Sequence, residues 1–537
     1  MIRQIITFVT ITGIGIAQPD LKFDPFDWIQ YRQAGKVNSI TFGDRFAYIG
    51  TQSGGVLRFN TFANRFEESI TMAQGLQSNT ITAVHRSSNG MLWVATPFGI
   101  EFSFNEVGNW RFIDWNQISL GSITFIERIG ESENSVWLGT SGLVYRIDPV
   151  TGVLTGVMSN PDETVLWSSG LLQLRTNISD ILIDFTLMNG WITDLQSLIH
   201  PNGKQINITT ITKNAFNEVW FGTEDGTIFR GDNTMKTFTP YRFSLASNDI
   251  WAIGGEDTFW LGGRLGNFQS GISYLDIERV IADVYLFDEI INMDETSVFS
   301  ILELKEEIWF GGENTILVYN KNKDYWRTYN VQIDGRKGWV TSMLEVGKNI
   351  WLGGPNGIYV LRKSDKKIID SEVNSFFKDI FIYDLAFGDK QIWIGTETGI
   401  FLYDTENDFI RNYTSYGYTK SDVIFPGNPT DFTAFVKDEH QILTASRSGI
   451  LSFNFRDRQW SNAVNPSIFG GLEIKAMALD NNILFIATTN NLVQYDMKKN
   501  LLDVYNYSFI GQVNDMYIRD RRIWLGTTEG LISYHYK

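Results

Sequence analysis

The residue types that carry most enzyme chemistry are few and scattered in this sequence. It contains no cysteine, which excludes disulfides, iron–sulfur clusters, thiolate zinc sites and cysteine nucleophiles. The four histidines, His85, His200, His440 and His535, lie far apart in the chain and never at metal-ligand spacing. There is no HExxH motif, phosphate-binding loop or G-x-S-x-G nucleophile motif. We therefore expect no catalytic residues, no metal site and no cofactor, and we expect His85 to pack inside the fold or line a channel.

Carboxylates remain as candidates for acid–base chemistry or for a calcium site. Glu131–Glu133 and Asp438–Glu439 form dense acidic turns, and Asp384 and Asp515 lie in runs that we expect to line a channel. Charge clusters normally face water, so we interpret the acidic turns as solvated loops. We interpret Asp384 and Asp515 as structural hydrogen-bonding groups. The ligand-binding residues stay unknown from the sequence alone.

Length and charge narrow the class of protein. The chain has 537 residues, with 45 Lys+Arg against 61 Asp+Glu and a net charge of −16. That length exceeds one ordinary core, so two domains or a repeat array are expected. The acidic balance argues against a nucleic-acid partner, because such binding depends on Lys and Arg neutralising phosphates. Abundant glycine and aromatic residues with little proline favour many short strands.

The first 17 residues are typical of a signal peptide. Arg3 supplies a positive charge, Ile5–Ile16 is an apolar stretch, and Gly15 and Ala17 are small residues at the expected cleavage positions. The stretch is too short to span a bilayer comfortably, and no later segment is long enough either. We expect an exported protein, periplasmic or extracellular, that does not span a membrane.

A repeat decides the expected architecture. Eleven copies share an apolar residue, an aromatic, an apolar residue, Gly or Ala, a short turn, then Gly-apolar-x-x-Tyr/Phe, as in WVATPFGIEFSF at Trp93 and WLGTTEGLISY at Trp524. The copies recur about every 42 residues, except for one step of 83 after Trp137, where residues 163–177 are the best candidate for a degenerate twelfth copy. Each unit predicts four short strands joined by Gly, Asn and Asp turns.

Units of four strands at this period are the signature of β-propeller blades. The repeated aromatic should fill the space between adjacent blades, so we interpret it as core rather than as a sugar-stacking surface. The Gly or Ala two residues later should lie where a larger side chain would collide with the next blade. We expect an all-β fold of two β-propellers with about 12 four-stranded blades, about six in each ring.

The two ends of the sequence also indicate how a ring closes. The last copy ends after its third strand, at Gly530–Lys537, while Asp27–Tyr31 forms an isolated fourth-strand run near the N-terminus. We expect the N-terminal strand to complete the last blade and remove an exposed edge. The repeat is irregular at 149–206 and after Trp393, which predicts a first propeller of residues 18–160 plus 408–537 and a second of residues 161–407. Sequential rings, 18–270 and 271–537, are the alternative.

The repeats resemble the two-component regulator propeller repeat, whose pattern is N-x-I-T-x-I, a D-x-x-G turn, then W-I-G-T-x-x-G-L-x-x-Y. Asn79–Thr82 leading to Trp93–Thr96, and Trp524–Leu531, match it nearly residue for residue. The resemblance covers essentially the whole mature chain. It implies paired propellers of the kind that form periplasmic sensors of hybrid histidine kinases, often for glycan fragments, although no membrane helix or kinase follows in this sequence.

The layout at Asp27–Tyr31, Val37–Phe42 and Tyr48–Thr51 is also similar to that of the PorZ-like double propellers of the type IX secretion system. That group carries a C-terminal sorting domain that this sequence lacks, so attachment to the outer surface is not implied. We therefore expect a non-enzymatic, exported adaptor or recognition protein whose partner is an envelope or secreted protein, or a glycan. The alternatives are a carbohydrate-active lyase or hydrolase with a site at a channel mouth, and a sensor ectodomain working with a separate membrane kinase.

Overall fold

The computed structural model describes residues 23–118, 125–169, 178–194, 197–255, 258–265, 270–279, 281–290, 293–331, 338–427, 429–464 and 472–536. The predicted signal segment 1–17 lies outside these ranges. Within them the regular secondary structure is almost entirely β-strand, arranged in twelve sheets. The helical elements are short: α1 (Ser179–Leu182), α2 (Glu372–Phe376), and the 3-10 turns η1 (Met72–Gln74), η2 (Trp115–Ile118) and η3 (Tyr413–Ser415). Across the described ranges, no helix has the length and apolarity that crossing a membrane would require.

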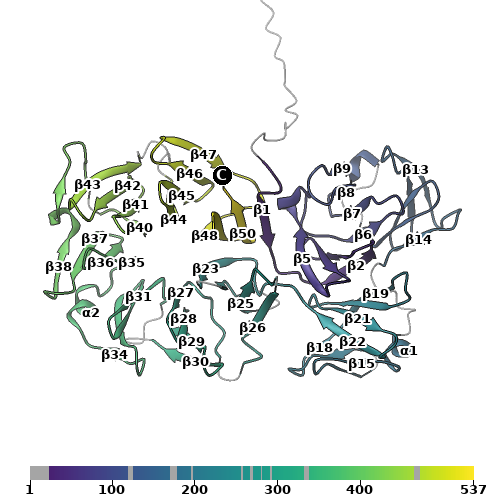
Figure 1. Ribbon diagram of the computed structural model, residues 1–537, viewed down its shortest axis with the longest axis horizontal. Coiled ribbons are helices and arrows are strands. Elements are labelled where there is room, and N and C mark those ends of the chain that lie inside the picture. Colours follow the sequence, from purple (N-terminus) through teal and green to yellow (C-terminus); the bar gives the residue numbers. More distant parts are fainter. Residues whose placement is uncertain are drawn as a thin grey trace, which may run out of the picture.

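Seven of the sheets form a closed ring, which we call the second ring (Figure 1, left). Their inner strands contact one another in the order β23, β27, β31, β35, β40, β44 and β48, and β48 contacts β23 again. From inner to outer strand, the blades are β23–β26 (Ile250–Gly254, Phe259–Gly263, Gly271–Asp276, Ile281–Leu286), β27–β30 (Ser300–Glu303, Glu307–Gly311, Thr315–Asn320, Tyr325–Asn330), β31–β34 (Ser342–Val346, Asn349–Gly354, Gly357–Arg362, Ile368–Ile369), β35–β38 (Ile382–Gly388, Gln391–Thr396, Gly399–Asp404, Phe409–Asn412), β40–β43 (Phe432–Lys437, Gln441–Ser446, Gly449–Asn454, Gln459–Val464) with β39 (Tyr418–Thr419) outside, β44–β47 (Ile474–Asp480, Ile483–Thr488, Leu492–Asp496, Leu501–Tyr505) and β48–β50 (Val513–Arg519, Arg522–Thr527, Gly530–His535) with β1 (Trp28–Tyr31).

The remaining sheets form the first ring (Figure 1, right). Its inner strands lie side by side in the order β19, β2, β6 and β10. The blades are β2–β5 (Val37–Phe42, Phe46–Thr51, Val56–Asn60, Arg65–Ile70), β6–β9 (Ala83–Arg86, Leu92–Ala95, Gly99–Ser103, Arg111–Asp114), β10–β13 (Arg128–Glu131, Val136–Gly139, Val144–Ile147, Leu154–Met158) with β14 (Leu166–Trp167), and β19–β22 (Ile208–Lys213, Val219–Thr223, Ile228–Asp232, Thr237–Tyr241) with β15 (Thr186–Leu187). A small sheet, β16–β18 (Ile192–Thr193, Leu198–Ile199, Gln205–Ile206), completes the set.

The predicted closure is confirmed. Strand β1 pairs antiparallel with β50, from Trp28 opposite Tyr534 to Tyr31 opposite Leu531, and so completes the last blade. An unpaired edge on β50 would be a template for association with other chains, and β1 covers it.

The repeated glycine approaches the next blade, as the sequence predicts. Each inner strand has, at or just before its beginning, a buried apolar residue that we call the start residue. A Cβ on Gly50 would lie 2.8 Å from the Ile81 side chain, and one on Gly353 would lie 2.7 Å from that of Ile382, both start residues of the following blade. In the last blade, Gly526 faces Ile250 at 3.0 Å, which closes the second ring. These distances leave no room for a side chain.

The repeated tryptophans pack between blades, which confirms that they form the core. Trp93, Trp137, Trp220, Trp309 and Trp393 are completely buried. Trp220 of blade β19–β22 contacts the rings of Phe42 and Phe59 in blade β2–β5, at 5.5 Å between centroids. The repeated indole therefore joins blades that are far apart in the sequence.

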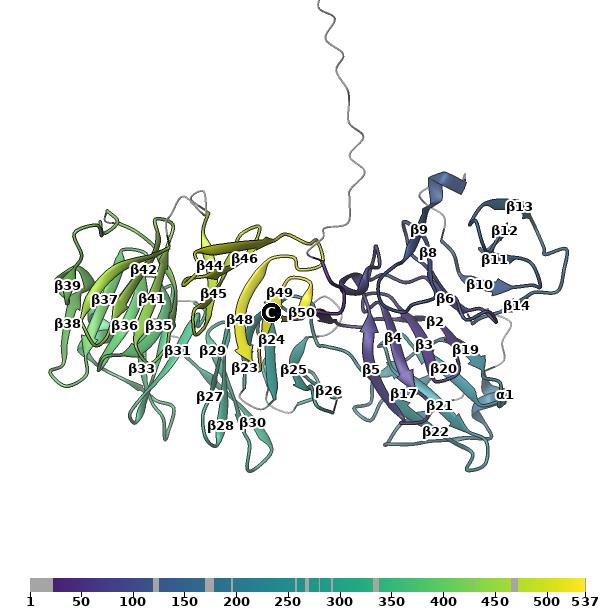
Figure 2. The ribbon, with the colours of Figure 1, turned by 45° about the horizontal axis from the view of Figure 1, so that its top comes forward.

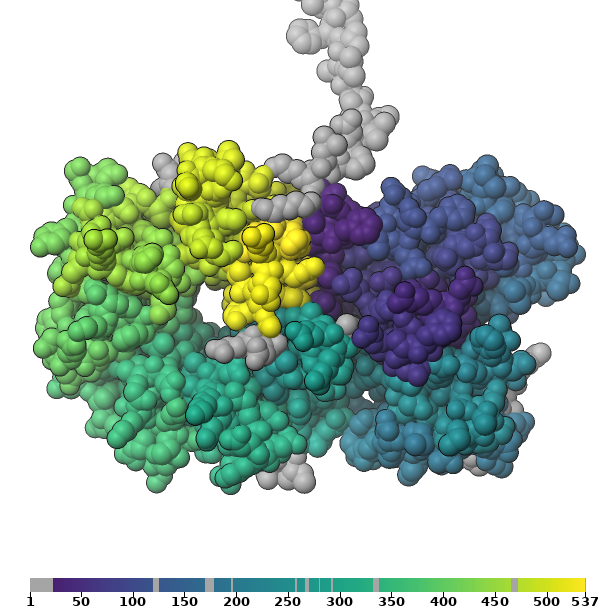
Figure 3. All heavy atoms as spheres, viewed as in Figure 1, coloured from purple at the N-terminus to yellow at the C-terminus, as the bar shows by residue number. Residues whose placement is uncertain are grey.

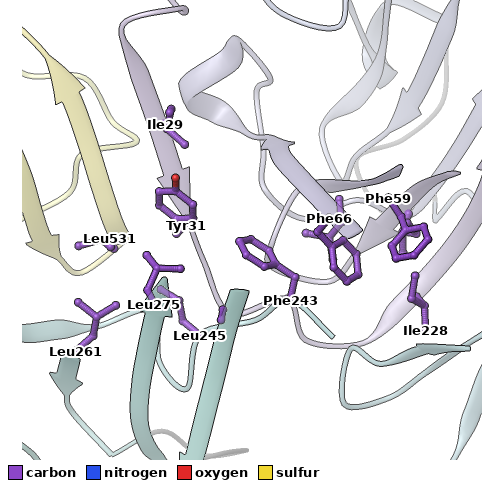
Figure 4. Packing of buried hydrophobic residues seen from close by; sticks show 14 of the residues in the cluster. Ile29, Tyr31, Phe59, Phe66, Ile228, Phe243, Leu245, Leu261, Leu275 and Leu531 are labelled. Atoms are coloured by element: carbon purple, nitrogen blue, oxygen red, sulfur yellow. The ribbon is translucent and has the colours of Figure 1, made fainter. Parts of the chain in front are cut away.

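Two segments cross between the rings side by side. The chain leaves β1, crosses at residues 32–36 to the first ring, and returns at residues 242–249. Ala34 N donates to Ser244 Oγ at 3.0 Å, and Gln33 N donates to Asn248 Oδ1 at 2.8 Å. Around these segments, buried residues of both rings form one core, to which Tyr31, Phe66, Phe243 and Leu275 contribute (Figure 4). Because the core is shared, the two rings form one packed unit (Figure 2).

The boundaries predicted for the two propellers are wrong. The ends of the chain do meet in one ring, but the inserted ring is residues 37–241 rather than 161–407, and a single strand precedes it. The sequential division at residue 270 would cut through blade β23–β26. The blades divide as seven in one ring and four, with the small sheet, in the other, instead of six and six. The expected twelfth copy at 163–177 forms no blade in its described part: residues 166–167 are β14, a strand added to the inner edge of β10.

Candidate functional site

The centre of the first ring is filled by its own chain. Strand β14 pairs with the inner strand β10. The next two residues bond to two more inner strands: Ser169 N donates to Ile40 O at 3.3 Å, and His85 Nδ1 lies 2.7 Å from Ser168 Oγ. A segment held by three inner strands at once lies on the axis of the ring, so it acts as a plug.

The second ring is open at its centre. Figure 3 shows a hole through the left half of the molecule, bounded by the second ring. Residues on the inner strands of this ring therefore face a solvent-accessible channel, and those that flank the start residues form one mouth of it.

In five of the eleven blades, the residue after the start residue links its blade to the next one. Its side chain donates a hydrogen bond to the carbonyl oxygen of the next start residue. The donors and acceptors are Asn38 and Ile81 (2.7 Å), Thr209 and Val37 (2.5 Å), Thr341 and Ile382 (2.7 Å), Thr433 and Ile474 (2.6 Å), and Asn514 and Ile250 (3.0 Å). We call this the linking position. A buried hydrogen bond of this kind contributes about 1 kcal/mol.

Three blades of the second ring have an aromatic residue at the linking position: Trp251, Phe299 and Tyr383. Two further aromatics, Trp339 and Phe381, lie immediately before the start residues of their blades. All five keep solvent contact; Trp339 is 42% exposed. The other four are partly buried, so each keeps part of its ring surface in contact with solvent. We call these five residues the rim aromatics.

The rim aromatics form a continuous arc over four consecutive blades. The ring centroids of Trp251 and Phe299 lie 4.9 Å apart, those of Phe299 and Trp339 6.0 Å, and those of Trp339 and Phe381 6.5 Å. Tyr383 follows, 4.6 Å from Phe381. Aromatic faces in such an arc offer a platform on which apolar, planar or cationic groups can stack.

The backbone around the arc is fixed. Gly338 N donates to Asn314 Oδ1 at 2.7 Å, and a bridge between Glu313 and Trp339 holds the chain next to it. Phe381 N donates to Glu397 Oε1 at 3.1 Å. A pocket next to Trp339, between blades β27–β30 and β31–β34, is lined also by Pro355 and Tyr359. The arc is therefore preorganised, which lowers the entropic cost of binding.

Acidic residues lie at both ends of the arc. Asp249 accepts the indole N–H of Trp251 at 2.7 Å. Burial raises the pKa of the Tyr383 hydroxyl, and the carboxylates of Asp431, Glu473 and Glu397 raise it further, while Arg447 opposes them. Three carboxylates and one guanidinium therefore lie near that end of the arc.

Asp384 and Asp515 are on the inner strands of the second ring, half-buried, as the sequence predicts for channel-lining residues. Asp384 Oδ2 accepts from Phe435 N, and Asp515 Oδ2 accepts from Ile253 N, each at 2.8 Å and each on the next blade. Burial raises the pKa of Asp384 to about 6, against three opposing hydrogen bonds. Burial raises the pKa of Asp515 to about 7, with a smaller contribution from the Asp384 charge. Both carboxylates therefore bond between blades and repel each other.

The other sequence candidates are dispersed. His85 lines the plug of the first ring, with Nε2 3.9 Å from the Glu131 carboxylate. Asp438 caps its own turn by accepting from the backbone N–H groups of His440 and Gln441. Among the described residues, no group of three or more histidines and carboxylates is arranged to hold a metal ion.

The rim aromatics were missed by the sequence reasoning, although a signal exists. The linking position is Asn or Thr in most blades, and an aromatic there departs from the repeat. Aligning the start residues rather than the repeated tryptophans would have found Trp251, Phe299 and Tyr383.

These features define a double β-propeller with one plugged ring and one open ring. No family model and no curated protein matches the chain. Among solved structures, the chain is similar to the extracellular domain of BT3049, a proposed hybrid two-component system of B. thetaiotaomicron: 18% identity, TM-score 0.43, 94% of this chain and 76% of the other. The extracellular domain of BT4673 from the same organism gives 16% identity and a TM-score of 0.44 over 93% of this chain and 70% of the other. Virginiamycin B lyase from Staphylococcus aureus gives 14% identity and a TM-score of 0.42 over 53% of this chain and 94% of the other.

Proposed function

We propose that this protein is an exported, non-catalytic recognition protein that binds its ligand at the mouth of the second ring. The observation that carries the proposal is the set of rim aromatics. Three of them occupy linking positions, where five other blades have a residue that bonds to the next blade. Partly exposed aromatics at such positions are explained by a ligand that covers their remaining surface, since rigid aromatic anchors supply much of the energy of recognition.

The signal-like segment 1–17 supports export, and the rigid junction between the rings supports a role in presenting the mouth at a fixed orientation. Recognition of this kind would serve an envelope adaptor, a subunit associated with secretion, or a sensor ectodomain that works with a separate kinase. Identifying the partner would distinguish these roles. We expect it to be an envelope protein, a secreted protein or a glycan.

A carbohydrate-active enzyme is the second candidate, favoured by the raised pKa values of Asp384 and Asp515. A carboxyl group with a pKa near neutral is suited to act as a general acid or base. Against this, each carboxylate accepts backbone N–H groups of its own and the next strand, a structural use of its oxygens.

The test compares three immobilised proteins: the wild type, a variant with Trp251, Phe299 and Trp339 changed to alanine, and the control Phe216→Ala. Phe216 is 82% exposed on the first ring, so the control removes an exposed aromatic away from the mouth. Each protein is screened against a glycan array and an envelope extract. We expect the wild type and the control to retain the same ligand and the rim variant to lose it.

Equal retention by all three proteins would refute a site at the mouth. Retained glycans should then be incubated with the wild type and with Asp384→Asn and Asp515→Asn, and analysed by mass spectrometry. Cleavage products that disappear in both variants would replace recognition with the lyase or hydrolase function.

A further inference from the structure

The chemistry of the ligand can be inferred from what the rim aromatics lack. Elsewhere in the described chain, thirteen pairs place an Arg or Lys over an aromatic ring, for example Arg230 over Trp220 and Lys366 over Trp309. Among the described residues, none of these pairs involves a rim aromatic. The fold thus places its own cations over many ring faces but over none of the rim aromatics described.

The charges around the arc are complementary to a cation. Arg447 and Lys475 both pair with Glu473, at 3.8 and 2.9 Å. Asp431 and Glu397, which raise the pKa of Tyr383, have no Arg or Lys partner among the ion pairs of the described residues. Deeper in the channel, no positive group contributes to the raised pKa of Asp384 or of Asp515. A cation at the mouth would meet both aromatic faces and uncompensated negative charge.

The length of the arc favours an extended peptide over a single small cation as the ligand. Trp251, Phe299, Trp339 and Phe381 are separated by successive centroid distances of 4.9, 6.0 and 6.5 Å. An extended peptide rises about 3.3 Å per residue, so about five residues would follow the arc. Alternate side chains of such a peptide lie on one side and can reach consecutive rings.

We propose that the mouth of the second ring binds an extended segment of a partner protein that carries arginine or lysine side chains. The segment follows the rim aromatics, its apolar side chains cover the ring faces, and its cationic groups stack on the aromatics near Asp431 and Glu397. This inference rests on the proposed function, because it names the ligand class of the same site.

The test uses three acetylated and amidated nine-residue peptides in which leucine alternates with arginine, citrulline or glutamate. Affinities are measured by fluorescence anisotropy for the wild type, the triple rim variant, Asp431→Asn combined with Glu397→Gln, and the control Phe216→Ala. We expect the arginine peptide to bind the wild type and the control about tenfold or more tightly than the citrulline peptide. We expect the rim variant to lose at least tenfold in affinity and the carboxylate variant about threefold.

Equal affinity of the arginine peptide for the wild type and the rim variant would overturn the inference, since binding would then reflect only the net charge. Preference for the citrulline or glutamate peptide would also overturn it. If a glycan binds at the rim while the arginine peptide does not, the inference fails and the proposed function stands. If no ligand of any kind depends on the rim, both fail. Circular dichroism checks that each variant is folded, and Trp251→Ala alone serves if the triple variant is not.

Discussion

Changing Asp515 to asparagine tests the balance of burial and hydrogen bonding in the channel. Burial raises the pKa of Asp515 to about 7 from an ordinary value of 3.8. Between these two values the folded protein holds a proton that the unfolded chain has released, so folding is favoured at low pH. This stability is complete below pH 3.8 and is lost as the pH rises through about 7.

The size of the effect follows from the same shift. One pKa unit corresponds to about 1.4 kcal/mol, so raising the pH from 5 to 8 should lower the free energy of unfolding by about 3 kcal/mol through this group. Contact with the open channel reduces this to about 2 kcal/mol. Asparagine carries no titrating proton, so Asp515→Asn should lack this loss. It has one acceptor oxygen for the N–H groups of Ile253 and Met516, which costs about 1 kcal/mol at every pH.

The assay is urea denaturation followed by tryptophan fluorescence at several pH values between 5 and 8. The difference in stability between the wild type and Asp515→Asn should shift by about 2 kcal/mol in favour of the variant across this range. Asp232→Asn is the control: Asp232 is an exposed turn residue whose pKa is lowered by the N–H groups of Met235 and Thr234, so it titrates below the range. Parallel curves for the wild type and Asp515→Asn would refute the reasoning.

Other substitutions separate the core from the rim. Gly353→Ala should cost about 1–3 kcal/mol in urea denaturation because its Cβ would press on the next blade, whereas Gly142→Ala, with no atom within 4 Å of the new Cβ, should cost nothing measurable. Trp309→Ala should lower stability by about 3–5 kcal/mol, but the partly exposed Trp339→Ala by only about 1–2 kcal/mol, which thermal unfolding can compare; similar losses for both would contradict the assignment of core and rim. Deleting residues 1–31 should expose the edge of β50 and cause association detectable by light scattering, and a monomeric product would count against this role of β1.

The repeat made the blades predictable because the same contacts recur in each of them. An indole must fill the space between two sheets, and the glycine two residues later must let the next blade approach. These demands fix residue type at fixed spacing, so Trp524 and Gly526 in the last blade were recognisable from the pattern alone. Closure by β1 followed from the same logic, since a blade with three strands needs a fourth.

The division into rings was not predictable from spacing. The step from Trp220 to Trp260, which crosses from the first ring to the second, is 40 residues, within the range of steps inside one ring. Crossing the junction needs a chain no longer than the connection between two neighbouring blades. The irregular stretch at 149–206 looked like a crossover, but its described part supplies the plug, α1, β15 and the small sheet, which occupy the incomplete first ring.

At three linking positions of the second ring, an aromatic side chain stands where other blades have a residue that bonds to the next blade. The first ring keeps Asn38 and Thr209 at its linking positions and fills its own axis. The second ring replaces the linking residue in three blades and leaves its axis open. In one of these, Tyr383 is followed at once by Asp384, whose carboxylate accepts from Ser342 on the blade before and from Phe435 N on the blade after. Asp384 therefore restores between blades a bond that Tyr383 does not make, which is why we assign the aromatic to recognition and the carboxylate to the fold.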